Sequence, residues 1–93
     1  MSNPRIDGLT PPSGEQGKEY DLDIYGGDFQ DGATVAFGTG IDVPDVTFRH
    51  DGNLIAKIDI APKAAVKKYG VTVTNPDKGT VTKPNAFEVI AAK

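Results

Sequence analysis

The sequence predicts an all-β fold, a sandwich of short strands in two antiparallel sheets. Apolar and polar residues alternate along most of the chain, which is the period of a strand buried on one face. Eleven glycines and seven prolines interrupt the 93 residues and leave no window long enough for a convincing amphipathic helix. Turn signals recur roughly every 8 to 12 residues, the spacing expected of a sandwich of short strands.

The clearest alternation follows a first predicted strand near 4–9. This second predicted strand lies at 18–25. It places Tyr20, Leu22 and Ile24 on one face and Asp21, Asp23 and Tyr25 on the other. Val35 and Phe37 repeat the pattern in a strand at 33–38. We expect the apolar face of both strands to point into the core.

Two further alternating runs are predicted to pair as a hairpin. Val46 and Phe48 mark a strand at 45–50, and the following residues, DGN, are a hairpin signal. In the strand after the turn, 54–60, the expected inward residues are Leu54, Ala56, Ile58 and Ile60, and the expected outward residues are Ile55, Lys57 and Asp59.

The last part of the chain supplies two more strands, at 69–74 and 86–91. The segment before them, APKAAVKK at 61–68, tolerates a helical turn, but a short connection fits it better than a full helix. Between the two strands, NPDKG is a turn signal. Pro76 presets φ for the first corner position, and Gly79 is expected to adopt the left-handed conformation.

The count is therefore about seven short strands, which indicates an immunoglobulin-like β-sandwich. The chain has no cysteine and no tryptophan, so the Cys…Trp…Cys core of antibody domains is absent. Tyr69 is in phase with the core residues at the start of the sixth strand, the place of a tyrosine corner. We expect its ring to be buried and its hydroxyl to bond to the backbone.

Three blocks of the sequence resemble the IPT/TIG family, immunoglobulin-like domains shared by plexins, some transcription factors and many bacterial surface proteins. The blocks are PRIDGLTPPSGEQGKEYDLDIYGGDFQDGATVAFG, IAPKAAVKKYGVTVTNPDKG and NAFEV. The matching pieces are the Pro-Ser-Gly turn with Gly14 and Gly17, the strand ending Gly26-Gly27-Asp28-Phe29, the strand Val35 to Gly38, Tyr69-Gly70-Val71 to Asn75, and Ala86-Phe87. Their order and spacing, over nearly the whole chain, carry the resemblance.

The resemblance implies a structural role for the glycine-rich stretch YGGDFQDGATVAFG. In the family the aromatic residue after the glycine pair packs inward, which implies that Phe29 is a core anchor. Gly26, Gly27 and Gly32 then allow the tight backbone path around it. Residues 26–30, GGDFQ, are similar to GGDEF, the signature of cyclic-dinucleotide synthases. A catalytic role of that kind is not expected, because the glutamate is missing and those enzymes use an α/β domain, whereas this chain is all-β. A phosphate-cradling loop would lead into a helix, whereas this one leads into a strand.

Size and charge exclude several functional classes. Ninety-three residues suit one domain, 1–93, which we expect to belong to a longer protein. The net charge of −3 and the pI of about 4.9 argue against nucleic-acid binding. No apolar run is long enough to span a membrane, and the amino terminus lacks the features of a signal peptide, so no membrane insertion is expected. The absence of cysteine removes disulfides and thiolate chemistry.

The charge is unevenly distributed along the chain. Residues 1–50 carry nine acids and three bases, whereas residues 51–93 carry four acids and seven bases. Two interpretations remain open. The charges are scattered and solvated, or they support head-to-tail contact with neighbouring domains.

No metal, cofactor or catalytic residue is predicted. Loop aspartates at positions 28, 31, 42 and 45 are suitable calcium ligands in principle, but the spacing of a calcium-binding loop is absent. His50, the only histidine, is expected to be an exposed strand-end residue with no nucleophile beside it. The paired acids Asp21 and Asp23 lack a cleft that would desolvate one of them.

The predicted function is a non-catalytic structural or protein-interaction module, a spacer or presenting domain in a larger surface, virion or secreted multidomain protein. Its expected partners are neighbouring domains or other proteins, and its expected location is extracellular, at a cell surface or at a virion surface. The alternative is an accessory carbohydrate-binding domain of a secreted polysaccharide-acting enzyme, with Tyr25 as the main exposed aromatic candidate. Sugar binding usually requires several exposed aromatic residues, and only Tyr25 is expected to be exposed, which favours the spacer role.

Overall fold

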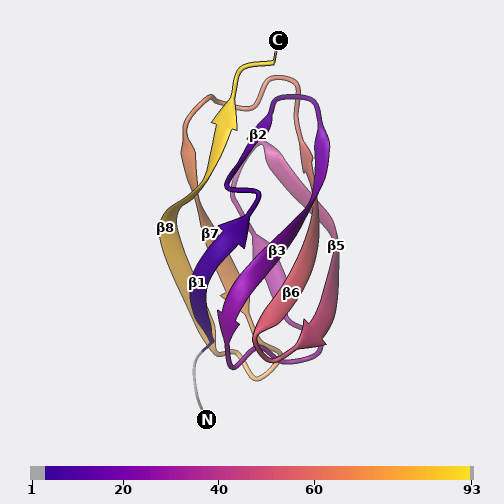
Figure 1. The fold of residues 1–93 in the computed structure, drawn as a ribbon, viewed down its shortest axis with the longest axis vertical. Helices are drawn as coiled ribbons and strands as arrows, with labels where there is room; N and C mark the ends of the chain where they lie inside the picture. Colours follow the sequence, from indigo (N-terminus) through magenta and orange to yellow (C-terminus); the bar gives the residue numbers. More distant parts are fainter. Residues whose placement is uncertain (1–3, 93) are drawn as a thin grey trace.

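The computed structural model describes residues 4–92, which form eight strands in two four-stranded sheets (Figure 1). The strands are β1 (Arg5–Thr10), β2 (Ser13–Glu15), β3 (Glu19–Gly27), β4 (Thr34–Ala36), β5 (Ile41–His50), β6 (Asn53–Ile60), β7 (Lys68–Thr74) and β8 (Thr80–Ile90). One sheet has the order β1-β3-β6-β5 and the other has the order β2-β8-β7-β4. This part of the chain contains no helix that could cross a membrane.

The strand order is that of an immunoglobulin sandwich. The sheet β1-β3-β6-β5 corresponds to the A-B-E-D sheet of a constant-type domain, and β4, β7 and β8 correspond to C, F and G. The predicted all-β sandwich is confirmed. Two details of the prediction are wrong, because there are eight strands instead of seven and because β2 pairs with β8 in parallel.

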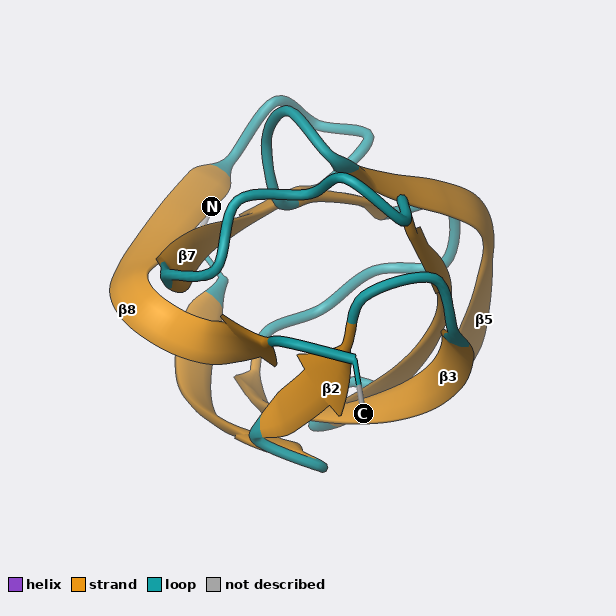
Figure 2. Ribbon diagram, turned by 90° about the horizontal axis from the view of Figure 1, so that it is seen from above, coloured by secondary structure: helices purple, strands orange, loops and turns teal. Residues whose placement is uncertain are grey.

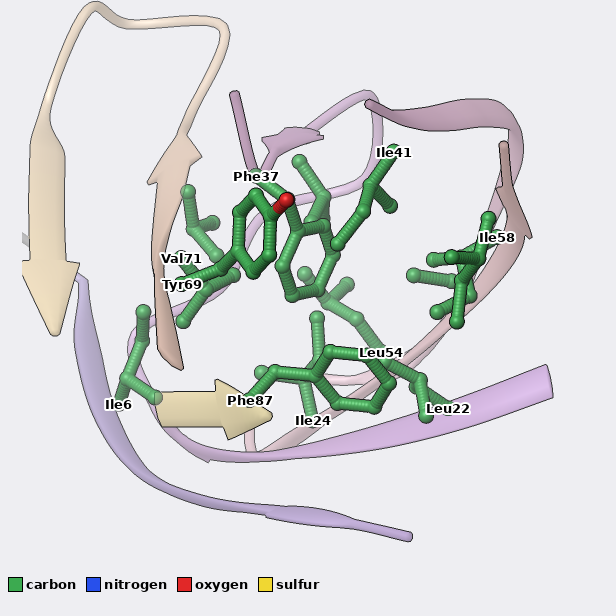
Figure 3. Packing of buried hydrophobic residues seen from close by; sticks show 14 of the residues in the cluster. Ile6, Leu22, Ile24, Phe37, Ile41, Leu54, Ile58, Tyr69, Val71 and Phe87 are labelled. Atoms are coloured by element: carbon green, nitrogen blue, oxygen red, sulfur yellow. The ribbon is translucent and has the colours of Figure 1, made fainter. Parts of the chain in front are cut away.

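The core lies between the two sheets and is made by the alternating residues that the sequence pattern placed inward. Seen from above, the strands surround this core (Figure 2), and their side chains fill the space between the sheets (Figure 3). The fully buried apolar side chains are Leu22, Ile24, Leu54, Ala56, Ile58, Ile60, Val71, Val73, Phe87 and Val89. Both β3 and β6 contribute to this list, which confirms their predicted inward faces.

Aromatic residues of the β2-β8-β7-β4 sheet and its loops pack in the core at defined points. The rings of Phe37 and Phe87 meet edge to face with centroids 5.7 Å apart. Tyr69, at the start of β7, is buried, and its hydroxyl donates to the Ala65 carbonyl oxygen over 2.9 Å. Both parts of the tyrosine-corner prediction are therefore confirmed. The bond ties the β6–β7 connection, which is irregular as expected, to the core.

The eighth strand was missed because local pattern does not reveal it. A turn is expected at Pro12-Ser13-Gly14, but Ser13–Glu15 forms β2 and pairs with Glu88–Ile90. Three residues are too short to show alternation. The pairing depends on tertiary contacts, since Gly14 is buried against the Tyr20 ring and leaves no room there for a side chain.

Two other strands are longer than predicted. β5 begins four residues earlier, at Ile41, and β8 begins six residues earlier, at Thr80. Both extensions contain a proline, Pro44 or Pro84, which favoured a loop interpretation. The register shifts between Asp42 and Asp45 in β5, and the β7–β8 pairing shifts between Tyr69 and Val71. These irregularities allow the strands to continue through the prolines.

The β7–β8 turn differs from the prediction in one residue. The Lys78 amide donates to the Asn75 carbonyl oxygen over 2.8 Å, which places Pro76 at the first corner position, as predicted. The left-handed residue of the turn is Lys78, with φ of 76°, instead of Gly79. A lysine therefore occupies a left-handed conformation that glycine would adopt at a lower steric cost.

Replacing this lysine should stabilise the domain. We expect Lys78→Gly to raise the free energy of unfolding by about 0.5–1 kcal/mol, because glycine adopts positive φ without the steric cost of a Cβ atom. Urea denaturation measures the change. The control is Lys57→Gly in the middle of β6, which should lower stability. A loss of stability in Lys78→Gly would contradict the argument.

Candidate functional site

The sandwich presents two ends, each formed by loops from both sheets. The N-terminal end is where β1 begins, and it carries the loops 28–33, 51–52 and 75–79. The C-terminal end is where β8 finishes, and it carries the loops 16–18, 37–40 and 61–67. Figure 1 shows these ends at the bottom and the top of the long axis. Within residues 4–92, every loop that carries a charged residue lies at one of these two ends.

The first part of the glycine-rich stretch, residues 25–33, lies at the N-terminal end and is structural. Phe29 is buried, which agrees with its implied role as a core anchor. Its amide donates to the Asp51 carbonyl oxygen over 2.9 Å, and the Gly26 amide donates to the Gly52 carbonyl oxygen over 3.0 Å. A Cβ atom at Gly26 would overlap the Arg5 carbonyl oxygen. Glycine is therefore required where β1 and β3 approach each other.

Asn75 connects two loops of the N-terminal end. Its side chain is almost fully buried, donates to the Asp28 carbonyl oxygen over 2.8 Å and accepts from the Gln30 amide over 3.1 Å. Sequence reasoning treated this residue only as the start of a turn. The available signal was weak, because a partner 45 residues away leaves no local pattern. The bonds hold the 28–33 loop against the β7–β8 turn.

Asp77 strengthens the same connection. The Gly79 amide donates to its Oδ1 over 2.9 Å, and the Gln30 side-chain amide donates to its Oδ2 over 2.9 Å. These bonds, that of Gly79 first, hold the pKa of Asp77 below the ordinary value for an aspartate. The folded N-terminal end thus favours the ionised carboxylate and keeps a negative charge there.

The loop aspartates considered as calcium ligands do not converge. Asp28 and Asp31 lie at the N-terminal end. Asp42 and Asp45 lie within β5, where Asp42 pairs with Asp59 near the opposite end and Asp45 pairs with Lys57 in the middle of the sheet. Within residues 4–92, no group of three or more acidic or histidine side chains is arranged to hold a metal ion. The only acids lining the hollow at 28–30 are Asp28 and Asp51.

His50 lies exposed at the end of β5, as expected. Its Nδ1 accepts a hydrogen bond from the Gly52 amide over 3.0 Å and lies 3.9 Å from a carboxylate oxygen of Asp51. The bond to Gly52 belongs to the tight β5–β6 turn. These contacts give the imidazole a local structural role.

Tyr25 is the exposed aromatic residue of the outer face of β3. Its side chain is 44% exposed, and its hydroxyl donates weakly to Asp23 over 3.4 Å. On β1 the residue opposite is Gly8, where an added Cβ atom would contact nothing. Further along the same face, Asp21 pairs across the strand with Lys57. The candidate aromatic surface therefore consists of one tyrosine beside an open patch of backbone.

The C-terminal end carries a shallow hollow that sequence reasoning did not identify. Its volume is about 360 Å³. The lining residues are Thr39, Gly40, Ala61, Lys63, Ala64, Ala65, Lys67 and Tyr69. The Lys67 ammonium lies 5.1 Å from the centre of the Tyr69 ring, a cation–π contact. The hollow thus has an apolar floor and two lysines among its lining residues.

The loop charges separate between the two ends. The N-terminal loops contain the acids Asp28, Asp31, Asp51 and Asp77 with one base, Lys78. The C-terminal loops contain the bases Lys18, Lys63 and Lys67 and no acid. Lys18 is paired with Glu15 over 3.3 Å. Strand residues add acids at the C-terminal end, where the exposed Glu19 and Asp42 both pair with Asp59 across the sheet, so the difference in charge between the ends is confined to the loops.

No protein-family model and no curated protein matches this chain. The candidate surfaces therefore rest on the structure of this chain alone. Within residues 4–92, every buried side-chain nitrogen and oxygen has a hydrogen-bond partner. The interior of this part of the chain therefore offers no unpaired polar group for a ligand.

The close approach at Gly26 predicts a large mutational effect. We expect Gly26→Ala to lower the free energy of unfolding by about 1–3 kcal/mol, because the new methyl group meets backbone that cannot rotate away. The matched control is Gly8→Ala, where the added methyl group has open space. Urea denaturation of both variants measures the difference. Equal effects at the two positions would refute the packing argument.

Proposed function

We propose that this chain is an IPT/TIG-like structural or protein-interaction module, which spaces and presents its neighbours in a larger protein. The observation that carries the proposal is where the first and last strands, β1 and β8, begin and end. β1 begins at one end of an elongated body and β8 finishes at the other (Figure 1), and the Cα extents are 43 × 21 × 19 Å. A domain of this form extends a series of domains along its long axis.

Stiffness at both ends supports the spacer role. At the N-terminal end, Asn75 and Asp77 join two loops through their side chains. At the C-terminal end, the Gln16 side-chain amide donates to the Ala64 carbonyl oxygen over 2.6 Å, and the Ala61 amide donates to the Gly40 carbonyl oxygen over 2.9 Å. Loops held by such bonds transmit the orientation of a neighbour better than free loops do.

In this role the partners are neighbouring domains or other proteins, and the function requires no cofactor and no catalytic residue. The resemblance to IPT/TIG domains favours a setting in a cell-surface, virion or secreted multidomain protein. The acidic balance remains unsuited to nucleic acid.

The spacer role is tested with two full chains joined in series by a short flexible linker. We expect small-angle X-ray scattering to give a maximum dimension about twice that of the single chain, because the ends of the 43 Å axis follow each other. The single chain is the control. A maximum dimension near that of one domain's length, from copies folded side by side, would overturn the proposal.

Polysaccharide binding is the second candidate, and the exposure of Tyr25 favours it. An exposed ring beside the open backbone at Gly8 can stack on a sugar face. The test is an NMR titration of the isotopically labelled chain with soluble starch-derived and cell-wall polysaccharides. Binding predicts shifts around Tyr25 that disappear in Tyr25→Ala. Unchanged spectra across the panel would exclude this candidate.

A further inference from the structure

We propose that the chain associates with a second copy of itself through the free edge of β5, so that the two β1-β3-β6-β5 sheets join into one. The contact is an antiparallel pairing of residues 45–49 with the same segment of the second copy, about a twofold axis at Thr47. This inference goes beyond the spacer role, which does not require it. The second copy is indicated as the partner because the sequence of this edge is complementary to itself.

β5 is the longest strand at the edge of a sheet. Within residues 4–92, four strands end a sheet, and β5 has 10 residues whereas β1 has 6 and β2 and β4 have 3 each. Figure 1 shows β5 along one side of the body, and β6 is its neighbour in the sheet. A free edge presents unpaired amide and carbonyl groups, which another strand can bind.

The hydrogen bonds of β6 fix the direction of its backbone groups. The Ile60 amide donates to the carbonyl oxygen of Lys18, just before β3, over 3.0 Å, so the polar groups of Ile60 face β3. The next residue, Ala61, faces the opposite way, and its amide donates to the Gly40 carbonyl oxygen over 2.9 Å. This alternation continues along the strand. The even-numbered residues of β6 therefore bond toward β3, and the odd-numbered residues bond toward β5.

Val46 and Phe48 have backbone groups that point to the free edge. They lie opposite Ala56 and Leu54, even-numbered residues of β6 that bond toward β3. In an antiparallel ladder the two residues of a pair either bond each other or both point away. The amide and carbonyl groups of Val46 and Phe48 are therefore free to pair with a further strand.

The segment at 45–49, DVTFR, is complementary to itself in antiparallel register. When Val46 of one copy pairs with Phe48 of the other, Thr47 lies opposite Thr47. At both ends of the segment, Asp45 then meets Arg49. Opposite residues share a face, so the acid–base pairs and the threonines lie on the outer face and the apolar pairs lie on the inner face. All three kinds of pair stabilise neighbouring strands.

Other registers are unfavourable. The pairing joins residues whose backbone groups are free, so the alternatives differ from it by two residues. A shift in one direction places Phe48 opposite Pro44, which has no amide to donate. A shift in the other direction places Asp45 opposite Asp51, and like charges directly opposite each other repel. The register centred on Thr47 avoids both faults.

The side chains of the segment are free for this contact. Val46 and Phe48 are half-buried at the margin of the core, and Asp45, Thr47 and Arg49 are exposed. Among residues 4–92, neither Asp45 nor Arg49 takes part in a salt bridge. A second copy would cover the two apolar side chains and pair both charges.

Shifts of register limit the contact to this segment. One shift lies between Asp42 and Asp45, and the other lies between Phe48 and His50. Beyond them the charges are not matched, because Asp42 of one copy comes toward Asp51 of the other. Both copies use the same segment, so the pairing closes as a twofold dimer and does not continue into a row.

Cysteine crosslinking tests the register, since the chain has no cysteine of its own. At the twofold axis the Thr47 pair is not hydrogen-bonded, which gives a Cα separation of about 4.5 Å, within the range that a disulfide spans. We expect Thr47→Cys to form an interchain disulfide in a glutathione buffer, where oxidised glutathione accepts the electrons. The matched control is Thr34→Cys, an exposed threonine on the edge strand β4. Equal crosslinking of the two variants would overturn the proposal.

Sedimentation equilibrium of the full chain measures the association. We expect a monomer–dimer equilibrium at concentrations up to about 1 mM. Arg49→Asp should weaken it about tenfold or more, because the acid–base pairs become acid–acid pairs. Adding Asp45→Arg to the same chain exchanges the charges and should restore the dimer, although the new arginine then lies opposite Lys57 on β6. The control Lys68→Asp, an equal change of charge on the other sheet, should leave the dimer intact.

The outcomes separate this contact from the spacer role. A monomer at every concentration, or no recovery in the charge-exchanged chain, would refute the β5 contact. The scattering experiment is repeated on two joined chains that both carry Arg49→Asp, in which self-pairing of β5 is weakened. A compact profile of that joined pair would contradict the spacer role, and the crosslinking result would still decide the β5 contact.

Discussion

Burial of alternate side chains between the two sheets is the constraint on which the rest of this structure depends. The inward residues of β3 and β6, such as Leu22 and Leu54, meet those of β7 and β8, such as Val71 and Phe87, with no exposed surface (Figure 3). Register follows from this burial, because a slip of one residue would turn the apolar side chains to the solvent. The positions of the loops follow from register, and so do the two ends.

The two loop-bearing ends are consequences of that arrangement. Strands that run along the long axis bring the loops together in two groups, although the members of each group are far apart in the sequence. Asp31, Asp51 and Asp77 share one end, and Lys18, Lys63 and Lys67 share the other. The loop charges therefore differ between the two ends, although the strand residues Glu19, Asp42 and Asp59 add acids at the end that carries the lysines.

Much of the fold could be predicted from the sequence because its signals are local. Alternation placed the strands, the DGN and NPDKG turns placed two hairpins, and Tyr69 marked a corner that the structure contains. The errors arose where a local signal was absent or misleading. β2 is too short to alternate, and the prolines of β5 and β8 are accommodated by register shifts that no sequence pattern announces. Lys78 occupies the left-handed position because the hairpin closes one residue before its glycine.

The candidate site was less predictable than the fold. Tyr25, His50 and Phe29 lie where the sequence pattern or the family resemblance placed them, since alternation and turn position decide exposure. The sequence by itself determined the fold class, the inward face of each main strand and the opposite charge of the two halves. Only the tertiary structure decided the link from Asn75 to the 28–33 loop, the hollow at Lys63 and Lys67, and the assignment of acidic and basic loops to opposite ends. The physical reason is that these features join residues distant along the chain, and their positions are set by sheet pairing and core burial.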